Sequence, residues 1–309
     1  MIEILQKPGA HLKRLALLAC SALLLVACGA QATPGVKVKS LETLTPGVIH
    51  VAIESYMPYS GLTKGGTLTG LDGDILAAAA KQLGYKLSIS VMDFAGTLAA
   101  VQSRRDDLTI GSVDWTQERT TTGLFTDPPY YSPSAAIEPD GENITSLGGF
   151  RNKTVGCLAG STYLTAIPDI PGATLKAYTS VPEALIDLKA GRIAAYFTDP
   201  LIGVDAIKTT TGLRVDYITP PTEAAVTQNP GLAAFGKSQT AFYVAKQEPK
   251  LASALSRLIR QFYADGKEAA FVRQWGGNPK AFLTAIPLFS TQRRGVDRPT
   301  AWSAPSIHS

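Results

Sequence analysis

Residues 231–238 satisfy the P-loop pattern letter for letter, which makes phosphate binding the first chemistry to consider. They read Gly-Leu-Ala-Ala-Phe-Gly-Lys-Ser. A P-loop binds phosphate only between a buried strand and a helix whose N-terminus points at the anion. Here Gln-Asn-Pro precedes the match, and the β-like stretch 240–245 follows it. Neither flank supplies the required context, so we interpret the match as chance and predict no nucleotide site.

Histidine and cysteine are too scarce for the catalytic or metal sites that depend on them. The three histidines are His11, His50 and His308. His11 lies in the N-terminal leader and His308 is the penultimate residue, so the sequence predicts no histidine-based triad, no metal site and no cofactor. Cys157 lies in an apolar run, which favours a buried structural thiol over a nucleophile.

The composition indicates a globular protein of roughly two domains. The chain has 309 residues, of which 45% are hydrophobic and 17% charged, and domains average about 150 residues. Its net charge is +4. Without the first fourteen residues, 26 basic residues face 24 acidic ones. A nearly neutral body gives no electrostatic reason to expect nucleic acid as a partner.

The N-terminal segment has the pattern of a secretory signal. Three basic residues, Lys7, Lys13 and Arg14, precede an apolar run at 15–27. This run is shorter than the ~20 residues that a helix needs to cross a bilayer. A basic segment before such a run is typical of a signal peptide. We therefore predict a signal peptide at 1–27 and export across the cytoplasmic membrane.

Cys28 ends a stretch that resembles a bacterial lipobox. Residues 25–28 read Leu-Val-Ala-Cys, and in a lipobox the cysteine thiol accepts a diacylglycerol. The resemblance implies that Cys28 carries a lipid that anchors the mature protein to the membrane without spanning it. An ordinary signal followed by an unmodified cysteine is the alternative. Residues 28–46 are interpreted as a flexible tether, and we expect a periplasmic or cell-surface lipoprotein.

Short apolar strands alternate with helices from residue 47 onwards. Alternating or β-branched residues predict strands at 48–53, 87–91 and 108–110. Apolar residues with helical spacing predict helices at 71–83 and around 98–101. This βαβαβ order predicts a parallel sheet covered by helices.

A second series of the same kind follows after residue 147. It comprises a strand at 153–158, a helix at 182–190, a strand at 193–198 and a helix at 200–209. The extended piece 134–138 leads into this half, and the extended piece 240–245 returns from it. The chain then forms its most strongly periodic helix, 249–265.

The first half lacks a late helix, so the helix at 249–265 is expected to pack on it. We therefore predict a discontinuous first lobe of residues 47–134 and 245–287. The second lobe, residues 135–244, would be inserted and joined by two extended crossings that act as hinges. Residues 288–309 are expected to form a loose tail.

Several stretches occur in a recognisable order. Residues 70–76 read Gly-Leu-Asp-Gly-Asp-Ile-Leu, residues 116–119 read Thr-Gln-Glu-Arg, and residues 125–131 read Phe-Thr-Asp-Pro-Pro-Tyr-Tyr. Residues 160–162 read Gly-Ser-Thr, and residues 190–199 read Ala-Gly-Arg-Ile-Ala-Ala-Tyr-Phe-Thr-Asp. Together they resemble, in order and spacing, the motifs of the extracytoplasmic solute-binding proteins of ABC transporters, specifically the polar amino-acid family.

This resemblance covers about residues 44 to 285 and implies both a fold and a function. The fold is an α/β fold of two lobes, the periplasmic-binding-protein fold, with a mostly parallel sheet and flanking helices in each lobe. The function is to bind a small amino acid or related amine and deliver it to the permease subunits of an ABC transporter. No bond is broken, so the protein is not expected to be an enzyme.

The resemblance also implies roles for the charged residues. Arg119 matches the family's arginine that holds the α-carboxylate of the ligand, a task that suits the two parallel N–H groups of a guanidinium. Asp199 matches the aspartate that pairs with the α-ammonium. It follows an apolar strand, where open α/β sheets bind their ligands. A surface charge at Arg119 and a helix cap at Asp199 are the alternatives.

Four further positions follow from the same motifs. Ser161 and Thr162 can offer hydroxyl and backbone N–H groups to the carboxylate. Ser112 follows the strand 108–110, where backbone groups face the cleft. Tyr56 begins Tyr-Met-Pro-Tyr, which resembles the family's Tyr-x-Pro-Phe segment, whose ring lies over the ligand side chain.

Two residues depart from the family pattern. Asp114 stands five residues before Arg119, where the family usually has Ser or Thr. If Asp114 faces the cleft, the site holds two acids and one arginine and favours an additional positive charge on the ligand. If it faces outward, it is only a turn residue. Trp115 either forms a wall of the pocket or fills the junction between the lobes.

Two other functions fit the same fold. A few members of this superfamily are periplasmic dehydratases of prephenate or arogenate, and such an enzyme needs an acid in the cleft that is placed for proton transfer. Asp114 is the candidate for that role. A ligand-sensing module is the other alternative. Turnover of prephenate, set against simple ligand-induced stabilisation, separates the enzyme from a binding protein.

Overall fold

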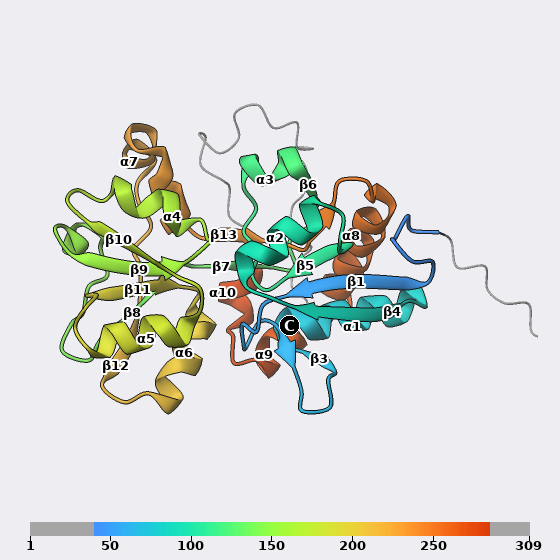
Figure 1. Ribbon diagram of the computed structural model, residues 1–309, viewed down its shortest axis with the longest axis horizontal. Coiled ribbons are helices and arrows are strands. Elements are labelled where there is room, and N and C mark those ends of the chain that lie inside the picture. Colours follow the sequence, from blue (N-terminus) through green and yellow to red (C-terminus); the bar gives the residue numbers. More distant parts are fainter. Residues whose placement is uncertain (1–39, 285–309) are drawn as a thin grey trace, which may run out of the picture. The chain divides into compact units, whose positions relative to one another are not determined.

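The structure, a computed structural model, describes residues 40–284. The predicted signal peptide, Cys28, most of the tether and the predicted tail lie outside the described residues. Within 40–284, no helix is both long enough and apolar enough to cross a membrane. The described chain has the predicted two-lobed α/β fold, with one five-stranded sheet in each lobe (Figure 1).

The first sheet has the strand order β4-β1-β5-β14-β6. Its strands are β1 (Val48–Ile53), β4 (Lys86–Val91), β5 (Leu108–Ile110), β6 (Gly123–Phe125) and β14 (Tyr243–Ala245). β1 pairs in parallel with β4 and β5, whereas β14 is antiparallel to β5 and β6. The parallel β1, β4 and β5 confirm the sequence-based prediction. β14 brings the late part of the chain into this sheet.

Five helices accompany this sheet. They are α1 (Leu71–Leu83), α2 (Phe94–Gln102), α8 (Pro249–Ala264), α9 (Lys267–Gln274) and α10 (Pro279–Leu283). The chain leaves α1 at Gly84, whose left-handed backbone lets its N–H donate to the carbonyls of Ala80 and Lys81. Asp93 starts α2 by accepting a hydrogen bond from the N–H of Gly96.

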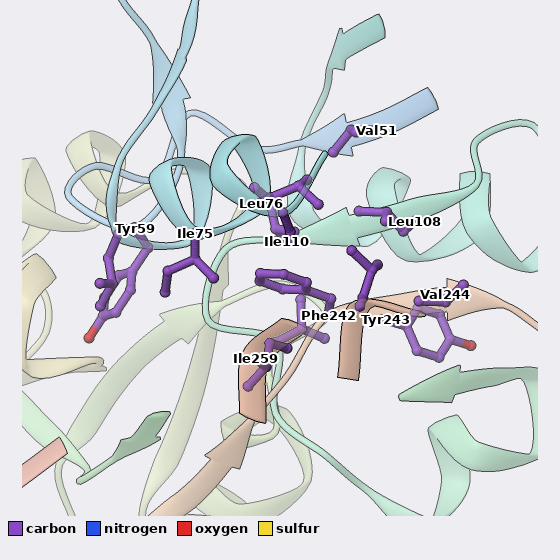
Figure 2. Packing of buried hydrophobic residues seen from close by; sticks show 14 of the residues in the cluster. Val51, Tyr59, Ile75, Leu76, Leu108, Ile110, Phe242, Tyr243, Val244 and Ile259 are labelled. Atoms are coloured by element: carbon purple, nitrogen blue, oxygen red, sulfur yellow. The ribbon is translucent and has the colours of Figure 1, made fainter. Parts of the chain in front are cut away.

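The core of this lobe lies between the sheet and these helices. Figure 2 shows Ile75 and Leu76 of α1 converging with three further side chains. These are Ile110 of β5, Phe242 just before β14, and Ile259 of α8. All five side chains are fully buried. Because burying one such side chain contributes about 1.5–3 kcal/mol, this cluster explains why the late helix α8 packs on the first half of the chain.

The second sheet repeats the same plan with the strand order β10-β9-β11-β8-β12. Its strands are β8 (Ala135–Pro139), β9 (Thr154–Leu158), β10 (Thr174–Tyr178), β11 (Ala195–Thr198) and β12 (Leu213–Tyr217). β9 pairs in parallel with β10 and β11, and β8 is antiparallel to β11 and β12. The sequence motifs did not predict β10 or β12.

The helices of the second half comprise α4 (Tyr163–Ala166), α5 (Val181–Lys189), α6 (Pro200–Thr209) and α7 (Glu223–Gln228). Three 3-10 turns, Leu147–Phe150, Ile167–Asp169 and Pro230–Phe235, complete the connections. Helices α5 and α6 agree with the predicted 182–190 and 200–209. Phe150, Phe197 and Phe235 form a buried aromatic cluster on the α4 side of the sheet.

The shorter elements lie in the connections of the first half. A small hairpin joins β2 (Gly61–Leu62) to β3 (Leu68–Thr69), and α3 (Gln117–Thr122) precedes β6. β7 (Tyr130–Ser132) pairs antiparallel with β13 (Ser238–Thr240).

The sequence predicted one extended piece at 240–245, but in the structure this piece is not one continuous strand. It divides between β13, which pairs with β7, and β14, which pairs in the first sheet. At the break, the N–H of Ala241 donates to the carbonyl of Val113, and the N–H of Phe242 donates to the hydroxyl of Thr126. These loop partners satisfy the backbone where the chain passes from one ladder to the next. The outgoing piece, expected as a crossing, is β8 of the second sheet.

Candidate functional site

The predicted site residues come together at the carboxyl ends of parallel strands from both sheets. Tyr56 follows β1, Ser112 follows β5, Ser161 follows β9 and Asp199 follows β11. The four residues line one cavity together with Asp114 and Arg119. Carboxyl ends of parallel strands are where open α/β sheets bind their ligands. The sequence motifs thus identified residues that the fold brings together from distant parts of the chain.

The backbone around Asp114 is held by the returning chain. Asp114 forms an isolated antiparallel bridge with Thr240, and the N–H of Trp115 donates to the carbonyl of Gln239. This pairing directs the Asp114 side chain toward the second lobe, where its Oδ2 accepts a hydrogen bond of 2.7 Å from the hydroxyl of Thr162. Asp114 therefore faces the cleft and is not an outward turn residue.

Arg119 links the two lobes through backbone carbonyls. Thr116 starts α3 by accepting the N–H of Arg119 on its hydroxyl, which fixes where the arginine side chain begins. The guanidinium Nη1 donates to the carbonyl of Asp114 at 2.8 Å, and Nη2 donates to the carbonyl of Gly160 at 2.7 Å. The guanidinium carbon lies 5.6 Å from the ring centroid of Phe94. Arg119 thus lines the cavity and is not a free surface charge.

Asp199 lies at the start of α6 but does not cap it. Its side chain makes no hydrogen bond to the first turn of that helix. Instead, Oδ1 accepts from the hydroxyl of Ser132 at 3.0 Å, and Oδ2 accepts from the hydroxyl of Tyr56 at 3.2 Å. The Tyr56 hydroxyl also lies 3.0 Å from the hydroxyl of Thr198. Asp199 therefore reaches out of its own lobe toward Tyr56.

Burial and charge act together on Asp199. Burial first, and then the charge of the nearby Asp114, raise the pKa of Asp199 above its usual range. Hydroxyl groups of Ser132, Ser112 and Tyr56 oppose this shift because they stabilise the ionised carboxylate. A cation placed between Asp114 and Asp199 would offset the repulsion by Asp114, the second cause of the raised pKa of Asp199.

Asp72 positions the loop that carries Ser112, a role that the sequence reasoning missed. Its Oδ2 accepts the N–H groups of both Gly111 and Ser112 at 2.8 Å. Both of these residues have positive φ, 112° and 57°, and a Cβ at Gly111 would lie 2.8 Å from the hydroxyl of Ser60. The loop therefore needs glycine at 111. Asp72 lies in the first motif, which was the signal that could have revealed it.

Apolar side chains complete the cavity walls, and sequence reasoning did not single them out. The lining includes Phe94, Leu158, Tyr163 and Phe197. The cavity measures about 30 Å³. A second cavity of about 150 Å³ lies beside it and also has Asp114 in its wall, together with Trp115 and Thr162. Trp115 is 4% exposed and forms part of the wall of this second cavity.

Two other predictions concern residues that do not line the cavity of about 30 Å³. In the P-loop match, residues 236–238 lead into β13 and not into a helix, and the N–H of Gly231 donates to Oδ2 of Asp169. A carboxylate at that position is incompatible with bound phosphate. Cys157 is fully buried, and burial raises the pKa of its thiol to about 11, which keeps it protonated. Among residues 40–284, no group of His, Cys, Asp or Glu is arranged to hold a metal ion.

Comparison with known proteins identifies the family. The sequence model of the bacterial extracellular solute-binding proteins, family 3, matches residues 49–278. The chain is 28% identical over 279 residues to the L-cystine-binding protein TcyJ of Escherichia coli, covering 87% of this chain and 97% of that protein. It is also 28% identical over 225 residues to the L-arginine-binding protein of Pseudomonas aeruginosa, covering 71% and 84%.

Solved structures agree with this assignment. An ancestral arginine-binding protein bound to arginine superposes with a TM-score of 0.65 at 26% identity, covering 75% of this chain and 99% of that one. An ancestral amino-acid-binding protein described as a precursor of cyclohexadienyl dehydratase has a TM-score of 0.62 at 23% identity, covering 74% and 95%, and shares the fold. The chain belongs to the bacterial extracellular solute-binding proteins, family 3.

Proposed function

We propose that this protein binds a small amino acid or related amine between its lobes and delivers it to the permease of an ABC transporter. The observation that carries the proposal is the convergence of Arg119 and Asp114, which follow β5, with Ser161 and Asp199 of the second sheet on one cavity. Relatives named as amino-acid-binding proteins support this class of ligand.

The contacts between the lobes suggest how binding is coupled to closure. Thr162 bonds to Asp114, Arg119 bonds to the carbonyl of Gly160, and Tyr56 bonds to Asp199. The cavity of about 30 Å³ is far smaller than the ~300 Å³ or more that ligand sites usually offer. Ligand entry therefore requires these contacts to separate. A ligand that bridges both lobes then favours the closed state, because only closure makes both sets of contacts.

The lobe limits and the lipid anchor belong to the same proposal. We propose lobes built from 47–134 with 245–287 and from 135–244. The two sheets support this division except at Tyr243 and Val244, which belong to β14 of the first sheet. We also propose that residues 1–27 are a signal peptide and that Cys28 carries the lipid. The protein would then act outside the cytoplasmic membrane, attached to it by that anchor.

Thermal stability of the purified protein tests the proposed function. A ligand that binds the native state raises the melting temperature, so we expect some members of a panel of amino acids and polyamines to do so. Isothermal titration calorimetry of those compounds should give one site per chain. A panel without any stabilising compound would contradict the proposal. Conversion of added prephenate to product would instead favour the dehydratase alternative.

A further inference from the structure

Two of the three side chains assigned to a ligand carboxylate, those of Arg119 and Thr162 but not Ser161, already donate hydrogen bonds within the protein. The Thr162 hydroxyl donates to Oδ2 of Asp114 at 2.7 Å. The two terminal nitrogens of Arg119 donate to the carbonyls of Asp114 and Gly160. The side-chain carboxylate of Asp114 thus takes the hydrogen bond that a ligand carboxylate would take from Thr162.

The charges that line the cavity also disfavour a carboxylate on the ligand. Asp114, Asp199 and Arg119 are its charged lining residues, which leaves one excess negative charge when both acids are ionised. Among the described residues, Asp114 is also the only charged side chain that lines the neighbouring cavity of about 150 Å³. Neither cavity therefore offers an additional cation to neutralise a carboxylate on the ligand.

The hydrogen-bonding capacity of the two acids also favours a ligand with N–H donors and positive charge. Oδ1 of Asp114 is buried and accepts no hydrogen bond within the described chain. Asp199 is surrounded by the hydroxyls of Ser132 and Tyr56, which are neutral donors. Buried carboxylates are costly without a positive partner. A ligand that brings N–H donors and positive charge would satisfy both acids, whereas a ligand carboxylate would be repelled by Asp114.

We infer that the preferred ligand of this site is a cationic amine that carries no free carboxylate beside its ammonium group. The inference rests on the proposed function, because it concerns the same cleft between the lobes. It narrows the class of ligand to alkyl amines and to amino acids whose carboxyl group is absent or converted to an amide. In such a ligand, the ammonium contacts Asp199 and further N–H groups reach Asp114.

Matched pairs of compounds test the inference by calorimetry at constant pH and salt. The pairs are agmatine with arginine and cadaverine with lysine, and lysinamide serves as a third probe for the lysine series. We expect each amine to bind at least tenfold more tightly than its amino acid. Lysinamide should behave like cadaverine and not like lysine, because the amide removes the negative charge but keeps the bulk.

A variant and a control assign the effect to Asp114. Asp114→Ser removes the carboxylate and frees the Thr162 hydroxyl, so the preference for the amine should shrink at least tenfold. Asp205→Ser removes a negative charge from an exposed ion pair with Lys208 and should leave the preference unchanged. A preference that survives Asp114→Ser would overturn the inference, because Asp114 would not be its cause.

The outcomes for the wild-type protein separate the inference from the proposed function. Tighter binding of arginine and lysine than of their amines would overturn the inference and leave amino-acid binding intact. Binding of none of the five compounds, nor of any other amino acid, would contradict the proposed function itself. Tighter binding of agmatine and cadaverine, lost in Asp114→Ser, would support both.

Discussion

The hydroxyl of Thr162 donates to the carboxylate of Asp114 at 2.7 Å, and this bond joins the two lobes at the ligand cavity. Asp114 follows β5, and Thr162 follows β9 in the other sheet. A serine or threonine at 114 would lack the negative charge of this contact. A protein with the family's usual serine or threonine at this position and this chain with its aspartate should therefore differ both in how the lobes are held closed and in the ligand charge that they favour.

Replacing Arg119 by lysine should weaken ligand binding while the fold survives. Lysine keeps the charge but has no planar fork, so it cannot bond to the carbonyls of Asp114 and Gly160 at the same time. We expect a loss of ~2–4 kcal/mol in binding free energy, or about 30- to 1000-fold in affinity, measured by calorimetry.

Arg260→Lys is the matched control for Arg119→Lys. Arg260 of α8 is exposed, pairs with Asp127 and does not line the cavity. This variant should bind as the wild type does. Equal affinity of wild type and Arg119→Lys would remove Arg119 from the site.

Affinity for a cationic ligand should fall as the pH decreases. The ligand needs ionised Asp199, and burial together with the charge of Asp114 raises the pKa of Asp199. Protonation therefore competes with the cation at a higher pH than for an ordinary carboxylate of pKa about 3.9. Calorimetry between about pH 5 and 8 should show the fall, with proton release on binding near the pKa.

Asp114→Ser should shift this pH dependence to lower pH. The substitution removes the like charge that helps to raise the pKa of Asp199, so the carboxylate ionises more readily. Burial still raises the pKa, and the shift should be partial. An affinity that does not change across this pH range in the wild type would contradict the assignment of Asp199 as the partner of the cation.

Glu248 should make the protein less stable as the pH rises. Its side chain is fully buried, and burial, with the charge of the nearby Asp107, raises its pKa to about 9. In the unfolded chain the pKa is about 4.3. The folded state thus binds the proton more tightly, so the contribution of Glu248 is complete below about pH 4 and is lost progressively toward about pH 9.

Glu248→Gln should remove most of this loss because the amide stays neutral at every pH in this range. We expect the free energy of unfolding at about pH 8 to rise by ~1–3 kcal/mol, with a flatter dependence on pH. Chemical denaturation at several pH values measures this. Glu142→Gln, at an exposed site, is the control and should follow the wild type. A wild-type slope in Glu248→Gln would show that Glu248 is ionised in the folded state.

Cys28→Ser should abolish lipid attachment. The thiol is the acceptor of the lipid in a lipobox, and serine cannot replace it, so the variant should accumulate as precursor or be released after other processing. Metabolic labelling with a palmitate analogue should mark the wild type and the control Cys20→Ser, whose substitution lies in the predicted leader. Equal labelling of Cys28→Ser and wild type would exclude Cys28 as the lipid site.

Much of the fold could be predicted because it follows from local patterns. The alternation in 87–91, the helical spacing in 71–83 and the β-branched run 48–53 are local patterns, and the structure forms β4, α1 and β1 there. Among the elements that the sequence analysis did not predict, β10 and β12 lie at the two edges of the second sheet. Both strands are partly exposed, and polar or charged residues interrupt their apolar pattern.

The sequence by itself determined which residue types are available to the site and in which order they occur. The motifs at 116–119, 160–162 and 190–199 supplied an arginine, two hydroxyls and an aspartate at strand ends. Only the tertiary structure decided where Asp114 points, because its backbone is held by a bridge to Thr240, which returns from the other half of the chain. A side-chain direction set by a partner so distant in sequence leaves no local pattern to detect.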